Sequence, residues 1–456
     1  MTHVLLPVSQ DELEVPDEAS DQEIDRVVSA SLAAFRGSWP RDHKRRAEVL
    51  LGWAERIESE FDSLVDEIVL ETGKITAEAR TELVGSIDAL RFNAGLARLP
   101  LGRAGSMSDG SESHLVREPV GPTVFITPWN WPVLLLLRDL APAFAAGVTA
   151  IVKPSPQTHM VTEHIVRLGH ESGIEAGVLQ VVAGGAVAGS ALVRHPGTAA
   201  VALTASTAAG QAVLRDSAET MTRPLLELGG KASMLVLPDG DLDQALAAAS
   251  RAAVTTSGQM CMACTRVLVH EDQLGETADR LGESIGALKV GDPRDPTSDL
   301  GPLISEAAFE KVSSYVDLAR RDATVRVGGE QVQPAGTRGF FMTPSVVTDA
   351  EPGSALVQDD IFGPVLSVES YRDEDDAVEL VNANSFGLAT SVWSRDLGRA
   401  LSVSRGIRSG TVWINGYNRS YAEAPSGGYR MSGLGRTRGV EGIEQFTELK
   451  HVHFSL

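Results

Sequence analysis

The 456-residue sequence contains only two cysteines, Cys261 and Cys264. Two cysteines cannot form the disulfide framework that stabilises many small secreted proteins, so we expect a reduced, cytoplasmic protein. The first 20 residues are acidic and lack the basic segment followed by an apolar segment that marks a signal peptide. The two thiols are therefore expected to serve in packing or in chemistry.

Basic residues are in deficit, with 40 Lys and Arg against 61 Asp and Glu and a net charge of −21. Nucleic acids and anionic membranes both need a basic surface on the protein, so we expect neither as a partner. Long apolar runs are missing too. The longest, Trp131–Leu137, is closed by Arg138 and falls far short of the roughly 20 residues that a membrane-spanning helix needs.

The length and the 43% hydrophobic content are typical of an ordered protein with two or three structural units. Ser20 and Glu23 have capping-box spacing, which predicts that the first ordered element begins at Ser20. The apolar periodicity then predicts one helix through residues 50–68 that ends near Gly73, and another over Thr81–Ala97.

Short apolar runs alternate with helical segments after residue 120. Such alternation predicts βαβ units and a parallel sheet buried on both faces, so the expected fold class is α/β. The predicted strands are Thr123–Ile126, Ala150–Lys153, Leu179–Val182, Ala199–Thr204, Ser233–Leu237, Arg266–Val269, Thr343–Val347 and Val365–Ser370. The Gly/Pro-rich stretch over residues 291–302 indicates a long turn and not a domain linker.

The segment Gly258-Gln259-Met260-Cys261 is the strongest local candidate for chemistry. A cysteine acts as a nucleophile only as the thiolate, and so needs a nearby base or positive field. An inert buried thiol is the commoner case. Cys261 and Cys264 also have C-x-x-C spacing, but no second pair with metal-ligand spacing follows, and no histidine lies in an H-E-x-x-H motif. No metal site is therefore predicted.

Two further segments hold groups that such a nucleophile would need. Glu227 ends an apolar run before Gly229-Gly230, which suits a general base approached closely by backbone. Asn130, between Trp129 and Trp131, has an amide N–H that suits a developing oxyanion. The alternative for Glu227 is a solvated side chain at a strand end, and the alternative for Asn130 is a proline-rich turn with packed tryptophans. The segments alone leave both alternatives open.

Glycines, hydroxyls and a lysine follow several of the predicted strands. Free N–H groups at helix N-termini bind phosphates, so this placement suits a nucleotide. The candidates are Lys153, Ser155, Gly185, Gly189, Thr204 and Ser206. Because the spacing is not G-x-G-x-x-G, the segment by itself is a weak indication.

Taken together and in this order, the segments resemble the aldehyde dehydrogenase superfamily. The resemblance spans roughly residues 20–450, and Cys261 follows Glu227 by 34 residues, which suits the family. The matching segments are Pro128-Trp129-Asn130, Lys153-Pro154-Ser155, Leu226–Lys231, Gly258–Cys261 with Thr265-Arg266, Ile361-Phe362-Gly363-Pro364, and Gly427-Gly428 through Ser432-Gly433.

The resemblance implies three structural parts. A modified Rossmann domain, residues 1–101 and 121–229, would bind NAD or NADP. An α/β catalytic domain, residues 230–431, would supply the nucleophile. A β-flap, residues 102–120 and 447–456, would join subunits into a homodimer or homotetramer. The small-molecule partner that the resemblance implies is an aldehyde.

The resemblance also implies a mechanism that agrees with the residue chemistry. Cys261 would attack the aldehyde to give a thiohemiacetal, whose oxyanion the Asn130 amide and the Cys261 backbone N–H would hold. Hydride would pass to the nicotinamide, and Glu227 would activate water to hydrolyse the thioester. The implied cofactor-binding residues are Thr127, Trp129, Lys153, Ser155, Gly185, Gly189, Thr204, Ser206, Leu228, Gly229, Asp360 and Phe362.

Three positions depart from the family pattern. Ala205 adds a methyl group beside the cofactor, which predicts weaker binding. Asp360 stands where relatives usually carry a Glu that grips the nicotinamide ribose, and it is one methylene shorter. Pro156 stands where NAD-preferring relatives often carry a Glu that binds the adenosine ribose and repels a 2′-phosphate. NADP therefore stays possible, with NAD slightly favoured.

The implied substrate pocket is polar. Two arginines and two serines favour an aldehyde with a carboxylate or other polar group, such as a semialdehyde or a polar aromatic aldehyde. The predicted pocket residues are Trp131, Arg138, Arg419, Ser420 and Ser426. In the alternative, Arg138 faces away and pairs with an acidic side chain.

Two other functions fit the same family. A CoA-acylating semialdehyde dehydrogenase is one, although such enzymes often lack the glutamate that Glu227 represents. A catalytically silent scaffold protein is the other, supported by Ala205 and Asp360 but opposed by Cys261 and Asn130. Cys264 is expected to be an unreactive buried thiol, with a disulfide to Cys261 as the alternative.

Overall fold

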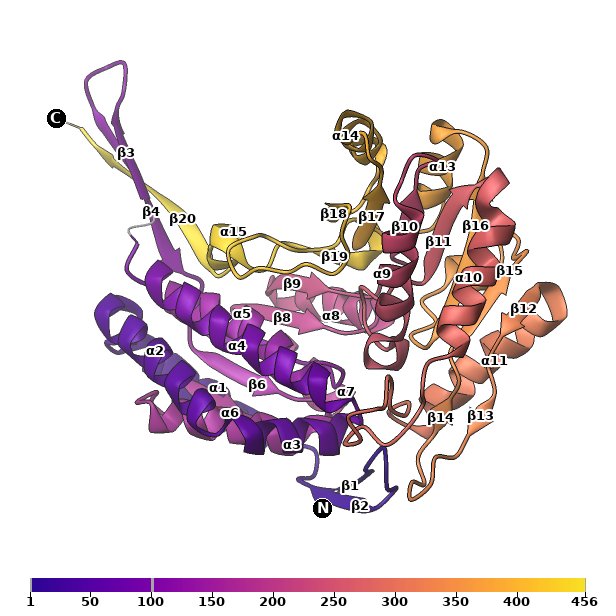
Figure 1. The fold of residues 1–456 in the computed structure, drawn as a ribbon. Coiled ribbons are helices and arrows are strands. Elements are labelled where there is room, and N and C mark those ends of the chain that lie inside the picture. The colour runs from indigo at the N-terminus through magenta and orange to yellow at the C-terminus, as the bar shows by residue number, and fades with distance from the viewer. Residues whose placement is uncertain (1, 100–101, 456) are drawn as a thin grey trace.

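The computed structural model describes residues 2–99 and 102–455. Two α/β lobes lie side by side, and a narrow three-stranded sheet projects away from them (Figure 1). The expected ends of the predicted domains at residues 1, 101 and 456 lie outside the described residues. No helix in the described ranges is both long and apolar enough to cross a membrane.

The chain begins with a hairpin of β1 (Thr2–Leu5) and β2 (Glu12–Val15), so the prediction that the first ordered element starts at Ser20 is wrong. A distant loop holds the hairpin, because the Arg338 N–H donates to the Val8 carbonyl at 2.9 Å. The two strands are short and largely exposed, so no apolar pattern marks them in the sequence.

Four helices follow the hairpin. They are α1 (Asp21–Arg36), α2 (His43–Ser59), α3 (Phe61–Thr72) and α4 (Thr76–Leu96). The predicted cap is confirmed, because the Glu23 N–H donates to Ser20 Oγ at 3.3 Å. The single helix predicted across residues 50–68 is wrong, since the chain breaks at Glu60, whose carboxylate accepts a hydrogen bond from His164 at 2.8 Å. Gly73 ends α3 with φ of 70°, as its C-cap position requires.

The first lobe surrounds a six-stranded sheet of order β19-β9-β8-β5-β6-β7, antiparallel only at β19. The strands are β5 (Thr123–Ile126), β6 (Ala150–Lys153), β7 (Leu179–Val181), β8 (Ala200–Thr204), β9 (Arg223–Glu227) and β19 (Gly433–Leu434). Helices α5 (Pro132–Ala146), α6 (His159–Glu171), α7 (Ala186–Arg194) and α8 (Thr207–Thr220) connect them. The order reverses between β5 and β8, and the crevice at such a reversal is where open α/β sheets bind ligands.

The second lobe surrounds a seven-stranded sheet of order β12-β15-β16-β11-β10-β17-β18, parallel except for β12. The strands are β10 (Ser233–Val236), β11 (Arg266–His270), β12 (Thr324–Val327), β15 (Ser345–Thr348), β16 (Val365–Tyr371), β17 (Ala389–Trp393) and β18 (Thr411–Ile414). Its helices are α9 (Leu242–Val254), α10 (Leu274–Gly286), α11 (Glu306–Asp322), α12 (Ala355–Gln358), α13 (Glu374–Asn382) and α14 (Leu397–Gly406), and β13 (Gln331–Val332) pairs with β14 (Phe341–Met342). Each strand predicted from the sequence is present in these two sheets, with ends shifted by at most two residues.

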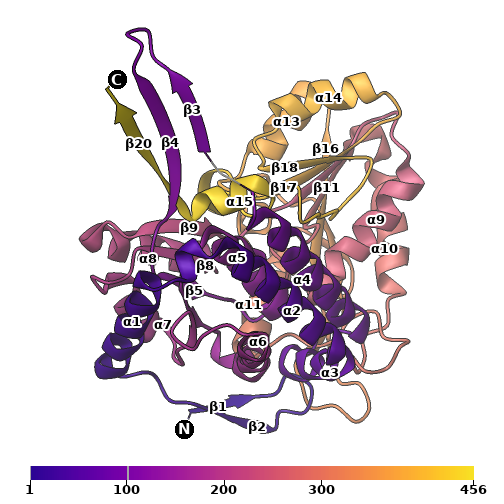
Figure 2. The same ribbon diagram turned by 90° about the vertical axis from the view of Figure 1, so that its left-hand side faces the viewer.

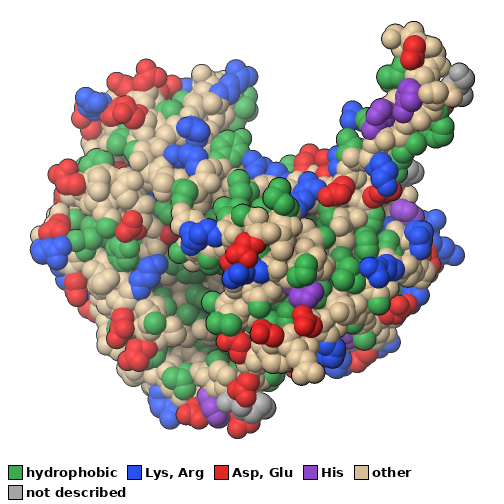
Figure 3. Space-filling view, turned by 180° about the vertical axis from the view of Figure 1, so that it is seen from behind, with side chains coloured by type: hydrophobic (Ala, Val, Ile, Leu, Met, Phe, Trp, Pro, Cys, Tyr) green, Lys and Arg blue, Asp and Glu red, His purple; other side chains and the backbone are tan. Residues whose placement is uncertain are grey.

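The projecting sheet consists of β3 (Gly102–Ser106), β4 (Glu112–Pro119) and β20 (Thr447–Phe454), in the order β20-β4-β3. Helix α15 (Gly439–Gln445) leads the chain from the first lobe into β20. The sheet stands clear of both lobes (Figures 2 and 3). The predicted α/β class is confirmed, and the two segments expected to form a flap are paired along the whole length of β4.

Candidate active site

Cys261 follows a turn of unusual backbone geometry. Thr256, Ser257 and Gly258 adopt φ values of 51°, 55° and 73°, in the left-handed region that costs non-glycine residues energy. The Thr256 N–H donates to the Glu78 carboxylate at 2.7 Å, which holds the turn from outside. A Cβ on Gly258 would lie 2.3 Å from the Gly363 carbonyl carbon. The turn therefore requires glycine at 258 and brings the cysteine loop against the Ile361–Pro364 segment.

Asn130 is held beside the cysteine by the same loop. Its Nδ2 donates to the Gln259 carbonyl at 2.9 Å, and the Gln259 side chain is itself fixed, because its Oε1 accepts the Ile304 N–H at 3.0 Å. The amide nitrogen of Asn130 has two hydrogens, so one remains for an oxygen near Cys261. Asn130 is only 4% exposed, so its side chain has little freedom to rotate away from Cys261.

Glu227 is the last residue of β9 and is buried near the same loop. Its Oε1 has no hydrogen-bond partner among the described residues, and its Oε2 lies 3.9 Å from Arg138 Nη1. The glycines that follow allow close approach, because a Cβ on Gly230 would lie 2.7 Å from the Cys261 carbonyl oxygen. The strand end thus delivers an unpaired carboxylate oxygen to the cysteine.

Burial perturbs both reactive groups. Burial and the nearby charges of Glu227 and Asp360 together raise the pKa of the Cys261 thiol to about 12, against the opposing charge of Arg138. Burial also raises the pKa of Glu227 to about 7, against the opposing positive charge of Arg138. At neutral pH Cys261 is therefore a thiol, while Glu227 is poised to take up or release a proton.

Two cavities of about 210 Å³ each meet at the cysteine. Both cavities are lined by Asn130, Leu135 and Cys261. Two molecules bound one in each cavity would therefore meet at the sulfur atom of Cys261. Glu227 lines the first cavity. The second opens at the carboxyl ends of β5 and β8, where the strand order reverses.

The second cavity brings together most of the residues predicted to bind the cofactor. Those that line it are Trp129, Thr204, Ser206, Leu228, Gly229, Asp360 and Phe362. Trp129 and Phe362 pack edge to face, 5.7 Å between ring centroids. Asp360 presses on Gly229, since a Cβ there would lie 2.3 Å from Asp360 Oδ2. Thr127 is buried but does not line the cavity, and its Oγ1 lacks a hydrogen-bond partner within the described part of the chain.

The other predicted cofactor residues form a separate group at the ends of β6 and β7. Lys153 Nζ donates to the carbonyls of Pro154 and Gly184 at 2.9 and 2.8 Å. A Cβ on Gly189 would lie 3.6 Å from the Lys153 side chain, so this glycine approaches it closely. Ser155 hydrogen-bonds the Gln157 side chain. With Gly185 at the start of α7, this group does not line either cavity at Cys261.

The first cavity is lined by four of the five predicted substrate residues. Trp131, Arg138, Ser420 and Ser426 line it. Arg419 does not line it. Its side chain is exposed and has no partner among the residues that the structure describes, and its backbone carbonyl accepts a hydrogen bond from Trp413 Nε1 at 2.9 Å.

Arg138 combines the two roles that the sequence left open. It pairs with the adjacent Asp139 through two hydrogen bonds of 2.9 and 2.8 Å, yet it also lines the cavity. Its Nη2 donates to Thr204 Oγ1 at 2.7 Å. Arg138 therefore links the proposed base, Glu227, to a residue of the second cavity.

Sequence reasoning missed two cations of the site. Arg438 lines the first cavity, and its side chain makes no hydrogen bond or ion pair with the described residues, although its backbone carbonyl accepts the Gly442 N–H at 2.7 Å. Lys311 lines the second cavity and donates to the Asp360 carbonyl at 2.8 Å. Arg438 reaches the cavity because β19 folds back beside β9, and nothing local in the sequence reveals such a return.

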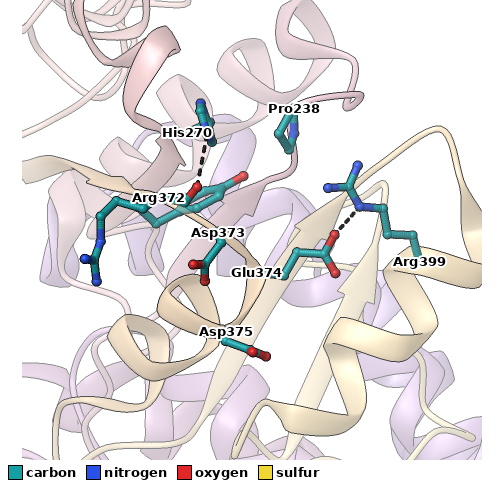
Figure 4. A pocket seen from close by; sticks show the side chains of 8 residues that line it. Pro238, His270, Arg372, Asp373, Glu374, Asp375 and Arg399 are labelled. Carbon is teal, nitrogen blue, oxygen red and sulfur yellow. Dashed lines mark hydrogen bonds and ion pairs between the residues drawn. The ribbon is translucent and has the colours of Figure 1, made fainter.

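A larger hollow of about 470 Å³ lies elsewhere, at Pro238, His270 and the start of α13 (Figure 4). Both of its arginines are paired, Arg399 with Glu374 and Arg372 with Asp376. It contains no cysteine and none of the predicted site residues. Size alone therefore does not identify a site of chemistry.

Comparison with known proteins agrees with this geometry. The model of the aldehyde dehydrogenase family matches residues 1–452. An aminoacetaldehyde dehydrogenase of Pseudomonas aeruginosa is 37% identical, over 94% of this chain and 88% of the relative, and a geranial dehydrogenase of Castellaniella defragrans is 36% identical, over 98% and 94%. A crystal structure of betaine aldehyde dehydrogenase from Staphylococcus aureus in complex with NAD⁺ superposes with a TM-score of 0.96 at 31% identity, covering 99% of this chain and 91% of that one.

The fold and the site define an α/β oxidoreductase with a cysteine between two cavities. The chain belongs to the aldehyde dehydrogenase family. The predicted resemblance and fold are thereby confirmed.

Proposed function

We propose that the protein oxidises an aldehyde to a carboxylic acid with NAD or NADP, using Cys261 as the nucleophile. The observation that carries the proposal is the meeting of two cavities at Cys261 and Asn130, with Glu227 lining one of them. An aldehyde in the first cavity and a nicotinamide in the second would face each other across the sulfur.

The second cavity fits a nicotinamide cofactor. Ser206 caps the N-terminus of α8 and Thr204 ends β8, which places hydroxyls and free N–H groups where phosphates bind. Gly229 has no side chain, so Asp360 can pack directly against its backbone at the edge of the cavity. When bound, the cofactor supplies a hydride acceptor. Trp129 and Phe362 would flank it, with Lys311 and Asp360 at the edge.

The residues at the sulfur provide the remaining chemistry. Glu227 accepts the Cys261 proton as the thiol attacks the aldehyde carbon, and the free N–H of Asn130 stabilises the resulting oxyanion. Loss of hydride to the bound cofactor would oxidise the thiohemiacetal to a thioester, and Glu227 releases the proton it took from Cys261 to solvent. The ionised Glu227 then takes a proton from water as the water oxygen attacks the thioester carbon, and it passes that proton to the departing Cys261 sulfur, so that the acid and the Cys261 thiol are released. The free state of both cysteines suits a reducing, cytosolic setting.

A single-turnover measurement tests this function. Mixing enzyme, NAD⁺ and aldehyde should give a rapid burst of NADH equal to the active-site concentration. Cys261→Ala should abolish the burst, and Cys264→Ala should keep it. A full burst from Cys261→Ala would overturn the proposal, and absence of any burst from the wild type with every aldehyde class would favour the catalytically silent alternative.

The first cavity suits an aldehyde that bears a carboxylate or another polar group, including a polar aromatic one. Arg138 is committed to Asp139 and Thr204, whereas Arg438 is unpaired among the described residues and lines the cavity with Ser420 and Ser426. A carboxylate would satisfy that guanidinium, and a charge-assisted hydrogen bond of this kind is worth roughly 1.5–3 kcal/mol. Asp88 also lines the cavity, so aminoacetaldehyde, which carries a cationic group, is the competing substrate to compare.

The substrate class is tested by kcat/KM for succinic semialdehyde, a hydroxybenzaldehyde, aminoacetaldehyde and hexanal. Succinic semialdehyde should be favoured, and Arg438→Met should lower its kcat/KM by about 10–100-fold, the equivalent of one such hydrogen bond. Arg419→Met is the matched control, because that side chain lies outside the cavity. A clear preference for hexanal would contradict the assignment.

CoA-acylating activity is the alternative within the family. Glu227 opposes it, because an ionisable carboxylate beside the cysteine favours attack by water on the thioester. NADH formation should therefore proceed without CoA, and a strict requirement for CoA would establish the alternative.

We also propose that the protein is a homodimer or homotetramer joined through the projecting sheet. Both outer strands, β3 and β20, have an edge that pairs with no other strand of the described ranges, and such edges readily accept another strand. Exposed Val116, Leu449 and Phe454 add apolar surface. Light scattering during gel filtration should give a multiple of the monomer mass, and a monomer would refute this part of the proposal.

A further inference from the structure

A carboxylate from the N-terminal segment occupies the start of helix α7. Glu18 Oε1 accepts the N–H groups of Gly185 and Ala188, at 3.1 and 2.7 Å. Gly185 is the N-cap of the helix and has no side chain to cap it. The approach is tight, because a Cβ on Gly184 would lie 3.2 Å from Glu18 Oε1. Glu18 is thus a capping residue supplied from 167 residues away.

The backbone positions Glu18 from both sides. The N–H of Ala19 donates to the Ala183 carbonyl at 3.2 Å, and Ser20 begins α1 as its N-cap. The carboxylate therefore belongs to a fixed segment, although part of its side chain is exposed to solvent. Its charge is a constant feature of the surface at the start of α7.

Lys153 lies beside this carboxylate. Its side chain is 5% exposed, Nζ donates to the Pro154 and Gly184 carbonyls, and Glu18 is the charge that raises its pKa against the larger lowering effect of burial. A helix N-terminus next to an ammonium group is a natural site for a phosphate. Here the helix N–H groups are already bonded to an anion, and the ammonium is already bonded to two carbonyls.

We propose that Glu18 determines the choice between NAD and NADP by filling the place that a 2′-phosphate would take. This rests on the proposed cofactor site and on its extension, implied by the family resemblance, from the second cavity to Lys153 and Gly185, where the adenosine half would lie. A ribose hydroxyl can approach Lys153 and a carboxylate without penalty, because it donates a hydrogen bond and has no charge. A phosphate would meet the negative charge of Glu18 and would have to displace it from two N–H groups.

Glu18 also explains how Pro156 is tolerated. Pro156 begins the short turn after β6 and offers neither a charge nor an N–H to the ribose. The acidic group needed to disfavour NADP is supplied by the segment before α1 instead. NAD specificity then depends on the packing of the segment before α1 against the start of α7, which is distant in sequence.

Isothermal titration of NAD⁺ and NADP⁺ into the intact enzyme tests the proposal by binding alone. Glu18→Gln keeps an acceptor oxygen for the two N–H groups but removes the charge, and Glu18→Ala removes both. The ratio of the NADP to the NAD dissociation constant should fall by roughly tenfold or more in each variant, the effect of one partly screened charge. Glu14→Gln removes an exposed charge of the same segment that does not contact α7, and it should leave the ratio unchanged.

The outcomes separate this proposal from the cofactor site on which it rests. Lys153→Met should weaken binding of both nucleotides; if it weakens neither, the cofactor site is wrongly placed, and the role of Glu18 falls with it. If Lys153→Met weakens both but the ratio in both Glu18 variants stays within twofold of the wild type, Glu18 is only a structural cap. A lower melting temperature of the Glu18 variants with an unchanged ratio would likewise reduce Glu18 to a cap.

Discussion

Replacing Arg138 by Met should move the pH dependence of turnover to higher pH. Arg138 Nη1 lies 3.9 Å from Glu227 Oε2, and its positive charge opposes the rise in the Glu227 pKa that burial causes. Met has similar bulk and no charge. Asp139 already raises the Glu227 pKa in the wild type and continues to do so in the variant, so the shift comes from loss of the Arg138 charge.

The geometry sets the size of the shift. Two unit charges 3.9 Å apart interact by about 4 kcal/mol at an effective dielectric constant of 20, or roughly three pKa units. Because Asp139 shares the Arg138 charge, we expect a rise of about two units from the starting value of about 7. Glu227 acts as a base only when ionised, so activity is present above its pKa and lost below it. At pH 7.5 the ionised fraction should fall about 25-fold.

Steady-state kcat measured from pH 6 to pH 10 reports the shift, provided that thioester hydrolysis limits turnover. A solvent isotope effect on kcat, with the burst retained, establishes that condition. Arg419→Met removes an exposed arginine charge that does not line the cavity, and its profile should match the wild type. An Arg138→Met profile with an unchanged midpoint would refute the assignment of Glu227 as the base under the influence of Arg138.

Two further predictions concern the cysteine loop. Gly258→Ala should lower the burst amplitude and the melting temperature, because the added methyl group would lie 2.3 Å from Gly363 and φ of 73° costs a non-glycine residue about 1–2 kcal/mol; a fully active, equally stable variant would show that the turn is not required. Cys264 is 1% exposed and donates to the Arg266 carbonyl at 3.6 Å, so Cys264→Ser should leave the rate and reversibility of peroxide inactivation unchanged; a changed reversibility would reinstate a disulfide with Cys261.

Local chemistry made much of the fold and site predictable. Strands such as Thr123–Ile126 are buried on both faces, so their unbroken apolar runs are visible in the sequence. Gly258 and Gly230 mark places where backbone must approach backbone, and no other residue fits there. Cys261 and Asn130 belong to segments whose residues and order together indicate one chemistry.

Long-range contacts could not be predicted in this way. The hairpin β1–β2 depends on Arg338, and the capping of α7 depends on Glu18. Arg438 reaches the first cavity through the return of β19 to β9, whereas Arg419, in the loop expected to line the pocket, is exposed to solvent. Pairing of side chains across such separations is set by packing, and neither periodicity nor spacing along the chain records it.

The proposed mechanism forms a thioester on Cys261, and Glu227 helps to hydrolyse it. The thioester should therefore accumulate when this base is removed. Glu227→Gln keeps the shape of a buried side chain whose Oε1 is unpaired among the described residues, but it removes the base. Mass spectrometry of this variant after mixing with NAD⁺ and aldehyde should show the acyl mass on the peptide that contains Cys261, in step with NADH formation. NADH formed without an acyl adduct, or with the adduct on Cys264 alone, would contradict the proposed mechanism.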